Sequence, residues 1–413
     1  MLRCAGRRRD INNLRCYAVS FVAVKRMIKN AVVLAGGRGV RLIPLTLRTP
    51  KPLLPVGNTP MLDHIISSLA RSGFDRIIVA VNYLGWKILA HLLQRWSESG
   101  LEIIAPSIQP EDTADAVRKL RDHIDGDFIV AMGDVITNMK LREFANAHEK
   151  WGGIASVALV EVPSLKDFGA VIIDKGGRIL HFIEKPRHEE VYVVSLAYCD
   201  PARLHMPYRN LANSGFYAFR YDILDILDDN PHLMDFGKHV FPWLLESGYE
   251  VRGWEAADAY WIDVGRHSTY LLANFDLLLG SASPLKPYGV EHGGVWLGED
   301  VDISEGARVL PPSAIGDNVE IGSGATVGPF AVLGHGARVE KDSRISYSVL
   351  LDGSSVGESS VIYQSILGKN VYVSPSCALE RAVVGDNEVV SGRIRASLEP
   401  IIYEKMKFDG VKA

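Results

Sequence analysis

Cysteine is scarce in this sequence, with only 4 among 413 residues. The four are scattered and form no CxxC pair, so the sequence predicts neither a zinc site nor a disulfide framework. Free thiols are typical of a reducing compartment, and we therefore expect a cytoplasmic protein. The four residues are Cys4, Cys16, Cys199 and Cys377.

Long apolar runs and an excess of one charge are also missing. No stretch approaches the roughly 20 apolar residues that a membrane-spanning helix needs, so we expect no membrane partner. The formal net charge is −4, which gives no reason to expect nucleic acid as a partner. With 47% hydrophobic and 23% charged residues, the chain resembles an ordinary globular protein, and its length indicates two or three domains.

Two common signatures of nucleotide binding are absent as well. The sequence contains neither GxGxxG nor GK[ST], which excludes a dinucleotide-binding fingerprint and a Walker A loop. The arginine-rich segment 1–26 ends in Lys25-Arg26 rather than in the small-residue cleavage site of a secretory signal. We interpret 1–26 as a disordered or untranslated extension, and a targeting segment is the alternative.

What is present, over about 27–265, is an alternation of strand-like and helix-like segments. Four apolar runs indicate strands: 31–34, 76–81, 103–104 and 128–131. Their alternation with helical segments predicts an α/β domain with a Rossmann-like, mostly parallel sheet that is covered on both faces. Ligands of such sheets bind beyond the carboxyl ends of the strands, here after Leu34, Val81 and Ala131.

The C-terminal third repeats a large aliphatic residue at every sixth position. A six-residue period predicts a parallel β-helix, in which these side chains stack inside and three hexads form one coil. We expect a linker helix within 266–290, the β-helix over 291–395 and a tail over 396–413, with a slip of register at Val356. The ten consecutive steps are Leu297, Ile303, Val309, Ile315, Ile321, Val327, Leu333, Val339, Ile345 and Leu351.

A glycine-rich motif directly follows the first strand, with the sequence LAGGRGVRL over 34–42. Glycines let the backbone approach a phosphate closely, and successive N–H groups form an anion-binding nest. Arg41 adds a fixed positive charge for phosphate oxygens. Lys51 follows in a stiff, proline-bounded segment, PKPLLPV over 50–56.

Two aspartates are candidate metal ligands. Asp134 follows Gly133 directly after a strand, and Asp263 lies in the sequence YWIDVG over 260–265. Mg²⁺ usually takes one or two carboxylates together with substrate phosphates. Each aspartate alone is compatible with an ordinary turn residue, so their pairing carries the interpretation.

Together these motifs resemble the signature of the sugar-phosphate nucleotidylyltransferases, LAGG-x-G-T/S-R-L followed by PKPLLP, with a G-D pair and a W-x-D-V/I-G segment. The resemblance covers nearly the whole chain after Met27, including a C-terminal left-handed β-helix of hexapeptide repeats. It implies that a sugar 1-phosphate and a nucleoside triphosphate are joined, with Mg²⁺ as cofactor and release of pyrophosphate. Val40 replaces the usual threonine or serine, so we expect an altered affinity for phosphate there.

The resemblance also implies roles for individual residues. The groups that hold the reacting phosphates would be Arg41, Lys51 and Lys185, and the metal ligands would be Asp134 and Asp263. The nucleotide-binding residues would be Leu34, Ala35, Gly36, Gly37, Gly39, Gln109 and Thr113. Thr113 could equally be the neighbour of a helix N-cap, and Asp112 stands where the family has glycine. The sugar-binding residues would be Gly169, Glu184 and Asn213.

The substrates are read as mannose 1-phosphate and GTP. The layout of the chain and the breaks in the repeats at 348–349 and 365–366 resemble mannose-1-phosphate guanylyltransferases. Glucose 1-phosphate with UTP, dTTP or ATP is an alternative. Two further alternatives remain. One is an additional sugar-phosphate acetyltransferase activity with His335 as general base, and the other is a non-catalytic regulatory subunit. We expect the β-helix to mediate formation of a homo-oligomer.

Overall fold

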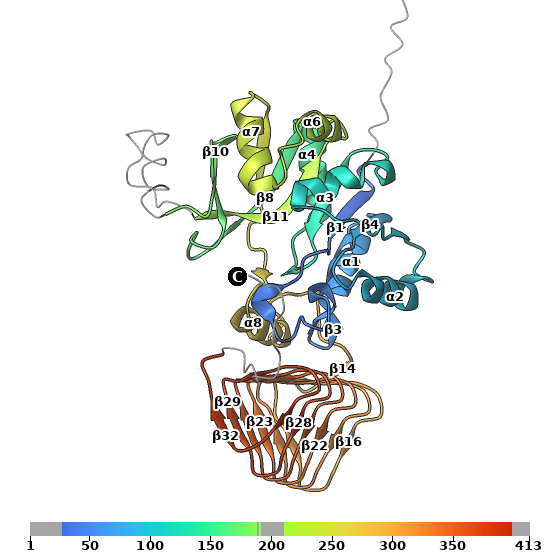
Figure 1. Cartoon of the computed structure of the whole chain (residues 1–413), viewed down its shortest axis with the longest axis vertical. Coiled ribbons are helices and arrows are strands. Elements are labelled where there is room, and N and C mark those ends of the chain that lie inside the picture. The colour runs from blue at the N-terminus through green and yellow to red at the C-terminus, as the bar shows by residue number, and fades with distance from the viewer. Residues whose placement is uncertain (1–26, 188–189, 191–209, 399–413) are drawn as a thin grey trace, which may run out of the picture.

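A computed structural model of the chain describes residues 27–187, 190 and 210–398. The expected extension 1–26, most of the expected tail 396–413 and three of the four cysteines lie outside these residues. The described part forms an α/β body with a β-helix stacked below it (Figure 1). This arrangement confirms the α/β fold class with a C-terminal β-helix.

The centre of the α/β body is a parallel sheet. Its strands lie in the order β6 (Phe128–Met132), β1 (Asn30–Leu34), β4 (Arg76–Ala80) and β5 (Glu102–Ile104). Leu34 is in register with both Ala80 and Met132, so the carboxyl ends of the three longest strands form one edge. Ligands of open α/β sheets bind at such an edge.

Beyond β6 the sheet continues with antiparallel neighbours, which the sequence pattern had not indicated. Strand β11 (Leu211–Phe219) runs antiparallel to β6 and carries the sheet away from its parallel centre. The other strands of this extension are β8 (Ala155–Glu161), β9 (Gly169–Ile173), β10 (Ile179–Glu184) and β12 (Val251–Glu255). A separate two-stranded sheet pairs β7 (Val135–Thr137) with β13 (Trp261–Asp263).

Helices cover both faces of the sheet, as predicted. Successive residues of a strand point to opposite faces, so Val33 enters one hydrophobic cluster and Val32 the other. The first cluster contains apolar residues of α1 (Met61–Arg71), α2 (Gly85–Trp96) and α4 (Leu141–Trp151). The second contains those of α3 (Thr113–Lys119), α6 (Ile223–Asp229) and α7 (Phe241–Glu246). No helix in the described ranges combines the length and the hydropathy needed to cross a bilayer.

The β-helix has three walls of parallel strands. The first comprises β15 (Val295–Leu297), β18 (Ser313–Ile315), β21 (Ala331–Leu333), β24 (Ser348–Leu350), β27 (Ile366–Leu367) and β30 (Val383–Val384), after an antiparallel β14 (Val290–His292). The second comprises β16 (Asp302–Ile303), β19 (Glu320–Ile321), β22 (Arg338–Val339), β25 (Ser355–Val356), β28 (Tyr372–Val373) and β31 (Val389–Val390). The third comprises β17 (Arg308–Val309), β20 (Thr326–Val327), β23 (Arg344–Ser346), β26 (Val361–Tyr363), β29 (Ala378–Glu380) and β32 (Arg393–Arg395).

From Ile315 onward the aliphatic ladder lies inside the β-helix, whereas Ile303 in the first coil is 42% exposed. The register of the ladder changes earlier than the sequence pattern predicted. Leu350, and not Leu351, pairs with Leu333 and belongs to the core, because the coil has shortened from 18 to 17 residues. The slip therefore falls before Leu351 rather than at Val356. Leu351 is buried in a different cluster, at the junction with the α/β body.

That junction is itself a continuous hydrophobic cluster. It joins Leu42 of the glycine-rich motif and Leu54 of the proline-bounded motif to Tyr270 of α8 (His267–Leu278) and to Val332 on the first wall of the β-helix. The buried Asn58 adds a polar contact, since its Nδ2 donates a hydrogen bond to the carbonyl oxygen of Leu333 at 2.8 Å. Asn58 lies between the short strands β2 (Pro55–Val56) and β3 (Thr59–Pro60). The segments that carry Arg41 and Lys51 thus rest directly on the β-helix.

Candidate active site

The glycine-rich turn leaves the carboxyl end of β1 with its backbone N–H groups open. Ala35 still donates a hydrogen bond to the carbonyl oxygen of Ala80 at 3.1 Å. Within the described ranges, the N–H groups of Gly37, Arg38 and Gly39 have no hydrogen-bond acceptor. Gly39 has a φ of 62°, and a Cβ atom there would lie 2.9 Å from Cγ2 of Thr46, so only glycine fits.

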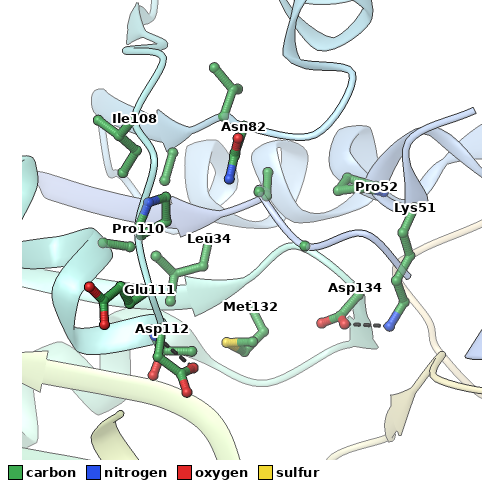
Figure 2. Close-up of a pocket in the computed structure, with 17 residues that line it drawn as sticks. Leu34, Lys51, Pro52, Asn82, Ile108, Pro110, Glu111, Asp112, Met132 and Asp134 are labelled. Carbon is green, nitrogen blue, oxygen red and sulfur yellow. Dashed lines mark hydrogen bonds and ion pairs between the residues drawn. The ribbon is translucent and has the colours of Figure 1, made fainter. Parts of the chain in front are cut away.

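A cavity of about 240 Å³ opens over this turn (Figure 2). Of the predicted phosphate, metal and nucleotide residues, it is lined by Leu34, Ala35, Gly36, Gly37, Lys51, Thr113 and Asp134. Gly39 lies outside the lining, and its left-handed backbone shapes the turn. The cavity therefore unites most of the predicted residues at the edge where the parallel strands end.

Some residues that line this cavity are absent from the predicted set. Asn82 follows β4 and lies beside Gly36, where a Cβ atom would come within 3.2 Å of Cβ of Asn82. The rule that ligands bind beyond strand ends already pointed to this position, directly after Val81. Glu111 and Asp112 line the opposite side of the cavity, and Figure 2 shows them across from Asp134.

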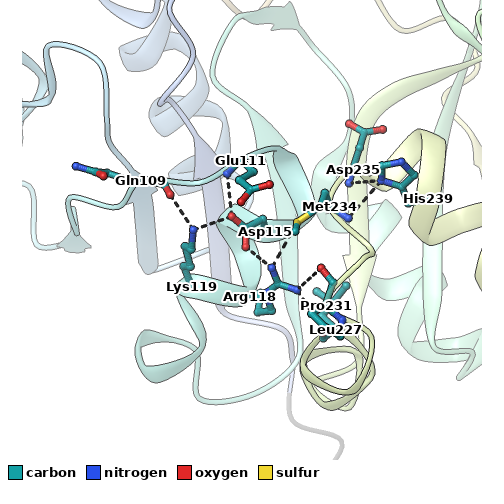
Figure 3. A network of polar contacts seen from close by, with 10 residues as sticks. All are labelled: Gln109, Glu111, Asp115, Arg118, Lys119, Leu227, Pro231, Met234, Asp235 and His239. Carbon is teal, nitrogen blue, oxygen red and sulfur yellow. Dashed lines mark hydrogen bonds and ion pairs between the residues drawn. The ribbon is translucent and has the colours of Figure 1, made fainter.

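The loop that carries Glu111 is anchored by a polar network around Asp115 (Figure 3). The carboxylate of Asp115 is buried and accepts hydrogen bonds from the N–H of Glu111 at 2.8 Å and from Arg118. Lys119 contacts the same carboxylate at 2.8 Å and also donates to the carbonyl oxygen of Gln109 at 2.7 Å. Gln109 is exposed and lines neither cavity of the site. The network fixes the backbone of Gln109, and its predicted contact with the base stays a prediction.

Lys51, Asp134 and Asp263 meet at the end of β6. The antiparallel pairing of β13 with β7 places Asp263 opposite Val135 and so beside Asp134. The ammonium group of Lys51 donates a hydrogen bond to the Asp134 carboxylate and lies 3.8 Å from Oδ1 of Asp263 (Figure 2 draws the first contact). The Lys51 side chain is only 8% exposed. One buried cation therefore faces two carboxylates that lie 129 positions apart in the sequence.

The electrostatics of this group favour a further cation. Burial raises the pKa of Asp263, and the neighbouring charge of Asp134 raises that pKa further, whereas Lys51 and Arg41 act in the opposite direction. Arg41 is close, since a Cβ atom at Gly265 would lie 3.0 Å from Nη2 of Arg41 and 3.1 Å from Oδ2 of Asp263. Two crowded carboxylates are the ligand type that Mg²⁺ takes together with phosphate oxygens and water. The described residues contain no cluster of three or more metal-binding side chains.

A second cavity of about 220 Å³ adjoins the first, because Thr113, Met132 and Asp134 line both. It lies against the antiparallel extension of the sheet. All three residues predicted to bind sugar line it, together with both metal candidates and one arginine: Gly169, Glu184, Asn213, Asp134, Asp263 and Arg41. Asp134 therefore stands between two adjoining compartments, and Asp263 faces the second of them.

Glu184 is one of the charged residues that line the second compartment. It lies against Gly169, where a Cβ atom would come within 2.9 Å of Oε2 of Glu184, so glycine is required for this approach. Burial raises the pKa of Glu184, and the nearby Asp235 adds to the shift. Asn213 is held by its own strand, since its Oδ1 accepts a hydrogen bond from the N–H of Gly215 and its Nδ2 donates to the hydroxyl of Tyr217, both at 3.0 Å.

Thr113 is the neighbour of a helix N-cap, one of the two roles considered from the sequence, and it also lines the first cavity, while its contact with a nucleotide stays a prediction. It is the first residue of α3, and Asp112 is the N-cap, whose Oδ1 accepts a hydrogen bond from the N–H of Thr113 at 2.9 Å. The hydroxyl of Thr113 donates to Oδ2 of Asp235 at 3.0 Å and accepts from the N–H of Phe236 at 3.1 Å. Thr113 thus links the two compartments while its hydroxyl is occupied within the protein.

Lys185 is the predicted residue that stands furthest from this arrangement. Its side chain is 62% exposed, lines neither cavity, and lies 3.9 Å from Oε1 of the adjacent Glu184. The residues 188–189 and 191–209, which follow it, lie outside the described ranges. Its predicted contact with the sugar phosphate stays a prediction.

Comparison with known proteins agrees with this geometry. Residues 30–279 match the family model described as nucleotidyl transferase, and residues 309–405 match the one described as GMPPB C-terminal domain. The two models together span both parts of the molecule, the α/β body with its two-compartment site and the β-helix.

The relatives of the chain are sugar-1-phosphate nucleotidyltransferases by their names. Mannose-1-phosphate guanylyltransferase 1 of Arabidopsis thaliana is 31% identical over 69% of this chain and 76% of its own length. The UTP–glucose-1-phosphate uridylyltransferase of Synechocystis is 26% identical over 69% of this chain and 78% of its own length. The glucose-1-phosphate adenylyltransferase of Trichlorobacter lovleyi is 30% identical over 60% of this chain and 65% of its own length. From the family match and the geometry of the site, the chain belongs to the sugar-phosphate nucleotidyltransferases, with a C-terminal β-helix of the GMPPB type.

Proposed function

We propose that this enzyme joins mannose 1-phosphate to GTP, giving GDP-mannose and pyrophosphate. One observation carries the choice of substrates. The β-helix matches the GMPPB C-terminal domain, and both Arabidopsis relatives, each 31% identical, are named mannose-1-phosphate guanylyltransferases. Relatives named as uridylyl- and adenylyltransferases are also similar to this chain, at 26% and 30% identity, so membership of the family alone does not select the base.

The reaction needs no nucleophilic side chain. An oxygen of the sugar 1-phosphate attacks the α-phosphorus of the triphosphate, and the bond from that phosphorus to the bridging oxygen breaks as pyrophosphate leaves. Catalysis then depends on positioning the two reactants in line and on stabilising the charge that develops on the phosphates. The two adjoining cavities suit this task, because Asp134 lines both of them.

Each group of the site has a role in this scheme. The first cavity would hold the nucleotide, with the open N–H group of Gly37 and the side chain of Lys51 on the triphosphate. Arg41 would reach the triphosphate from the adjoining second cavity, which it lines. The second would hold the sugar, with the carboxylate of Glu184 accepting hydrogen bonds from its hydroxyl groups. In the same scheme, Lys185 would bind the phosphate of the sugar from the rim.

Asp134 and Asp263 are the residues that would hold Mg²⁺. The donor set fits, because both carboxylates are partly buried, lie close together and carry more negative charge than Lys51 alone neutralises. When bound, the ion neutralises charge on the α-phosphate and on the departing pyrophosphate. Lys51 holds the two carboxylates in place and opposes the upward shift in the pKa of Asp263, and Arg41 adds a second positive charge that acts in the same direction.

The test is a substrate grid that measures release of pyrophosphate in the presence of Mg²⁺. GTP, UTP, dTTP, ATP and CTP are each combined with the 1-phosphates of mannose, glucose, glucosamine and N-acetylglucosamine. We expect the highest kcat/KM for GTP with mannose 1-phosphate, and no turnover in the Asp134→Ala variant. A higher value for glucose 1-phosphate with UTP, dTTP or ATP would contradict the proposed substrates. If the folded protein released no pyrophosphate with any pair of substrates in the grid, a non-catalytic regulatory subunit would be favoured.

A further inference from the structure

The second cavity is strongly acidic for a compartment that has to accept a phosphate group. Among the described residues, Arg41 is the only cationic side chain in its lining, and the predicted phosphate ligand Lys185 lies outside it. A sugar 1-phosphate brings further negative charge, which these carboxylates repel, so additional cations are needed where the phosphate binds. The five carboxylates in the lining are those of Asp134, Asp167, Glu184, Asp235 and Asp263.

One of these carboxylates holds a cation at the edge of the cavity. Nη2 of Arg266 donates a hydrogen bond to Oδ1 of Asp167 at 2.9 Å. Asp167 lies in the loop before β9, whereas Arg266 follows Asp263 by three positions and directly precedes α8. Both side chains are about half exposed, Arg266 by 55% and Asp167 by 50%. The ion pair therefore joins the loop that leads to Gly169 with the segment that carries a metal candidate.

The loop before β9 is held in place by other contacts than this ion pair. The ring of Phe168 packs edge-on against that of Trp261, with the centroids 5.2 Å apart. The N–H of Phe168 donates a hydrogen bond to the carbonyl oxygen of Leu165 at 3.0 Å, and the N–H of Lys185 donates to that of Phe168 at 3.2 Å. An ion pair between exposed side chains contributes little to stability. A competing anion can therefore break the pair without disturbing the fold.

Arg266 stands close to the place where the phosphate of a bound sugar would lie. In the scheme above the sugar fills the second cavity, so its 1-phosphate points toward Asp134, which lines both cavities. Gly265, the neighbour of Arg266 in the chain, lies at this end, since a Cβ atom there would come within 3.1 Å of Oδ2 of Asp263. The charge of Arg266 also reaches this end: burial raises the pKa of Asp263, and Arg266 is among the cations that oppose the shift.

We propose that Arg266 binds the phosphate of the sugar 1-phosphate, and that Asp167 is the counter-ion that Arg266 exchanges for this phosphate. A phosphate group carries more charge than one carboxylate, and its oxygens match the planar donor pair of a guanidinium group. The guanidinium group therefore leaves Oδ1 of Asp167 when the sugar substrate binds. The inference rests on the proposed function only in taking a sugar 1-phosphate as substrate, and it holds for any sugar or base.

An exchangeable ion pair and a structural ion pair predict different effects of removing each partner. Without Arg266 the phosphate loses a ligand, so the sugar substrate binds more weakly. Without Asp167 the guanidinium group is no longer held by a competing anion, so the sugar substrate binds more tightly. If the pair only stabilised the loop, the loss of either partner would weaken binding.

The experiment measures KM for the sugar 1-phosphate at a saturating concentration of the triphosphate, with the pair of substrates that gives the highest kcat/KM in the grid. We expect Arg266→Gln to raise this KM about tenfold, as for the loss of a charged hydrogen bond. Asp167→Asn should lower the same KM about twofold to threefold, because the competing ion pair is a weak one. In the Arg266→Gln background the effect of Asp167→Asn should largely disappear, since the two residues act on each other. KM for the triphosphate should not change in any of these variants.

The matched control is an ion pair of similar exposure on the second wall of the β-helix. Arg338 pairs there with Glu320 at 3.3 Å, and Arg338→Gln should leave both KM values unchanged. All these side chains are exposed, so each variant should keep the melting temperature of the wild type. An unchanged KM in Arg266→Gln, or a higher KM in both single variants, would overturn the proposal while the proposed function stands. A wild type that turns over no pair of substrates would contradict the proposed function, and this inference with it.

Discussion

The interior of the β-helix and the edge of the sheet treat buried polar groups in opposite ways. In the β-helix, buried Ser343 and Ser360 donate hydrogen bonds to carbonyl oxygens of the chain, those of Gly357 at 2.8 Å and Ser374 at 3.0 Å. The buried Ser354 is the exception among the described serines of this domain, because its Oγ has no partner. At the end of β6, two carboxylates share one buried ammonium group, and backbone N–H groups stay open. Buried polar groups normally find partners, so those left without enough of them indicate where a ligand binds.

We expect the largest effect from removing the buried positive charge at the end of β6. Lys51→Met removes the cation between Asp134 and Asp263 and a contact to the triphosphate. We expect kcat/KM for pyrophosphate release to fall about 10³-fold, or ~4 kcal/mol. The control is Lys150→Met, because Lys150 is an exposed lysine on α4. An activity of the Lys51→Met variant within tenfold of the wild type would remove Lys51 from the catalytic group.

We expect the next largest effect from removing apolar contacts inside the β-helix. Ile362 lies inside the β-helix with none of its surface exposed, and it pairs with Ile345 and Leu379 in the neighbouring coils. Ile362→Ala should lower the free energy of unfolding of the β-helix by about 3 kcal/mol, through lost burial and the cavity left behind. Denaturant unfolding measures the loss, while KM at 25 °C should not change. The neighbouring Val361 is 44% exposed, so Val361→Ala should have little effect on either quantity.

A smaller effect separates stability from function at one residue. Burial raises the pKa of Glu184, so the native state holds this proton more tightly than the unfolded chain does. The ionised carboxylate therefore destabilises the native state at neutral pH, and this cost disappears as the pH falls below the unfolded value of about 4.3. Glu184→Gln should raise the melting temperature at pH 7 and lose that advantage near pH 4.

The same variant should weaken binding of the sugar substrate. A neutral amide accepts hydrogen bonds from sugar hydroxyls less strongly than a carboxylate does, so KM for the sugar 1-phosphate should rise about tenfold. KM for the triphosphate should stay the same, since Glu184 lines the second cavity and not the first. A melting temperature that falls at pH 7 would contradict the assignment of Glu184 as a residue held for function.

We expect the smallest effect at Val40, which replaces the threonine or serine usual in the family. This residue is 51% exposed beside the open N–H groups of the glycine-rich turn. Val40→Thr restores the hydroxyl group usual in the family, and we expect KM for the triphosphate to fall about threefold to fivefold, or ~1 kcal/mol. Val40→Ala serves as the comparison, because it removes the branched side chain without adding a donor. Equal KM values in the two variants would show that the hydroxyl makes no contact.

The difference between the β-helix and the edge of the sheet also explains how much of each region could be predicted from the sequence. The β-helix repeats one physical requirement at every coil, so ten aliphatic residues in step predict it without any knowledge of relatives. The prediction was wrong at Leu351, because the coil before it is one residue shorter than the earlier coils. A pattern with a constant step of six residues does not follow this change. The ladder itself resumes at Leu350 and Leu367.

The catalytic site has no such redundancy. Arg41, Lys51, Asp134 and Asp263 were predicted because long motifs surround them, and the fold brings all four together. Asp235 was missed, because nothing in its local sequence connects it to Thr113, 122 positions away.

The central claim is that Asp134 and Asp263 act as one unit that supports transfer of the nucleotidyl group. The most direct test measures kcat/KM for GTP with mannose 1-phosphate in the wild type, in Asp134→Asn, in Asp263→Asn and in the double variant. We predict that each single change lowers kcat/KM about 10³-fold and that the double change adds no more than about tenfold, as for residues that act together. Single-variant losses that multiply in the double variant, or a single variant within tenfold of the wild type, would contradict this account.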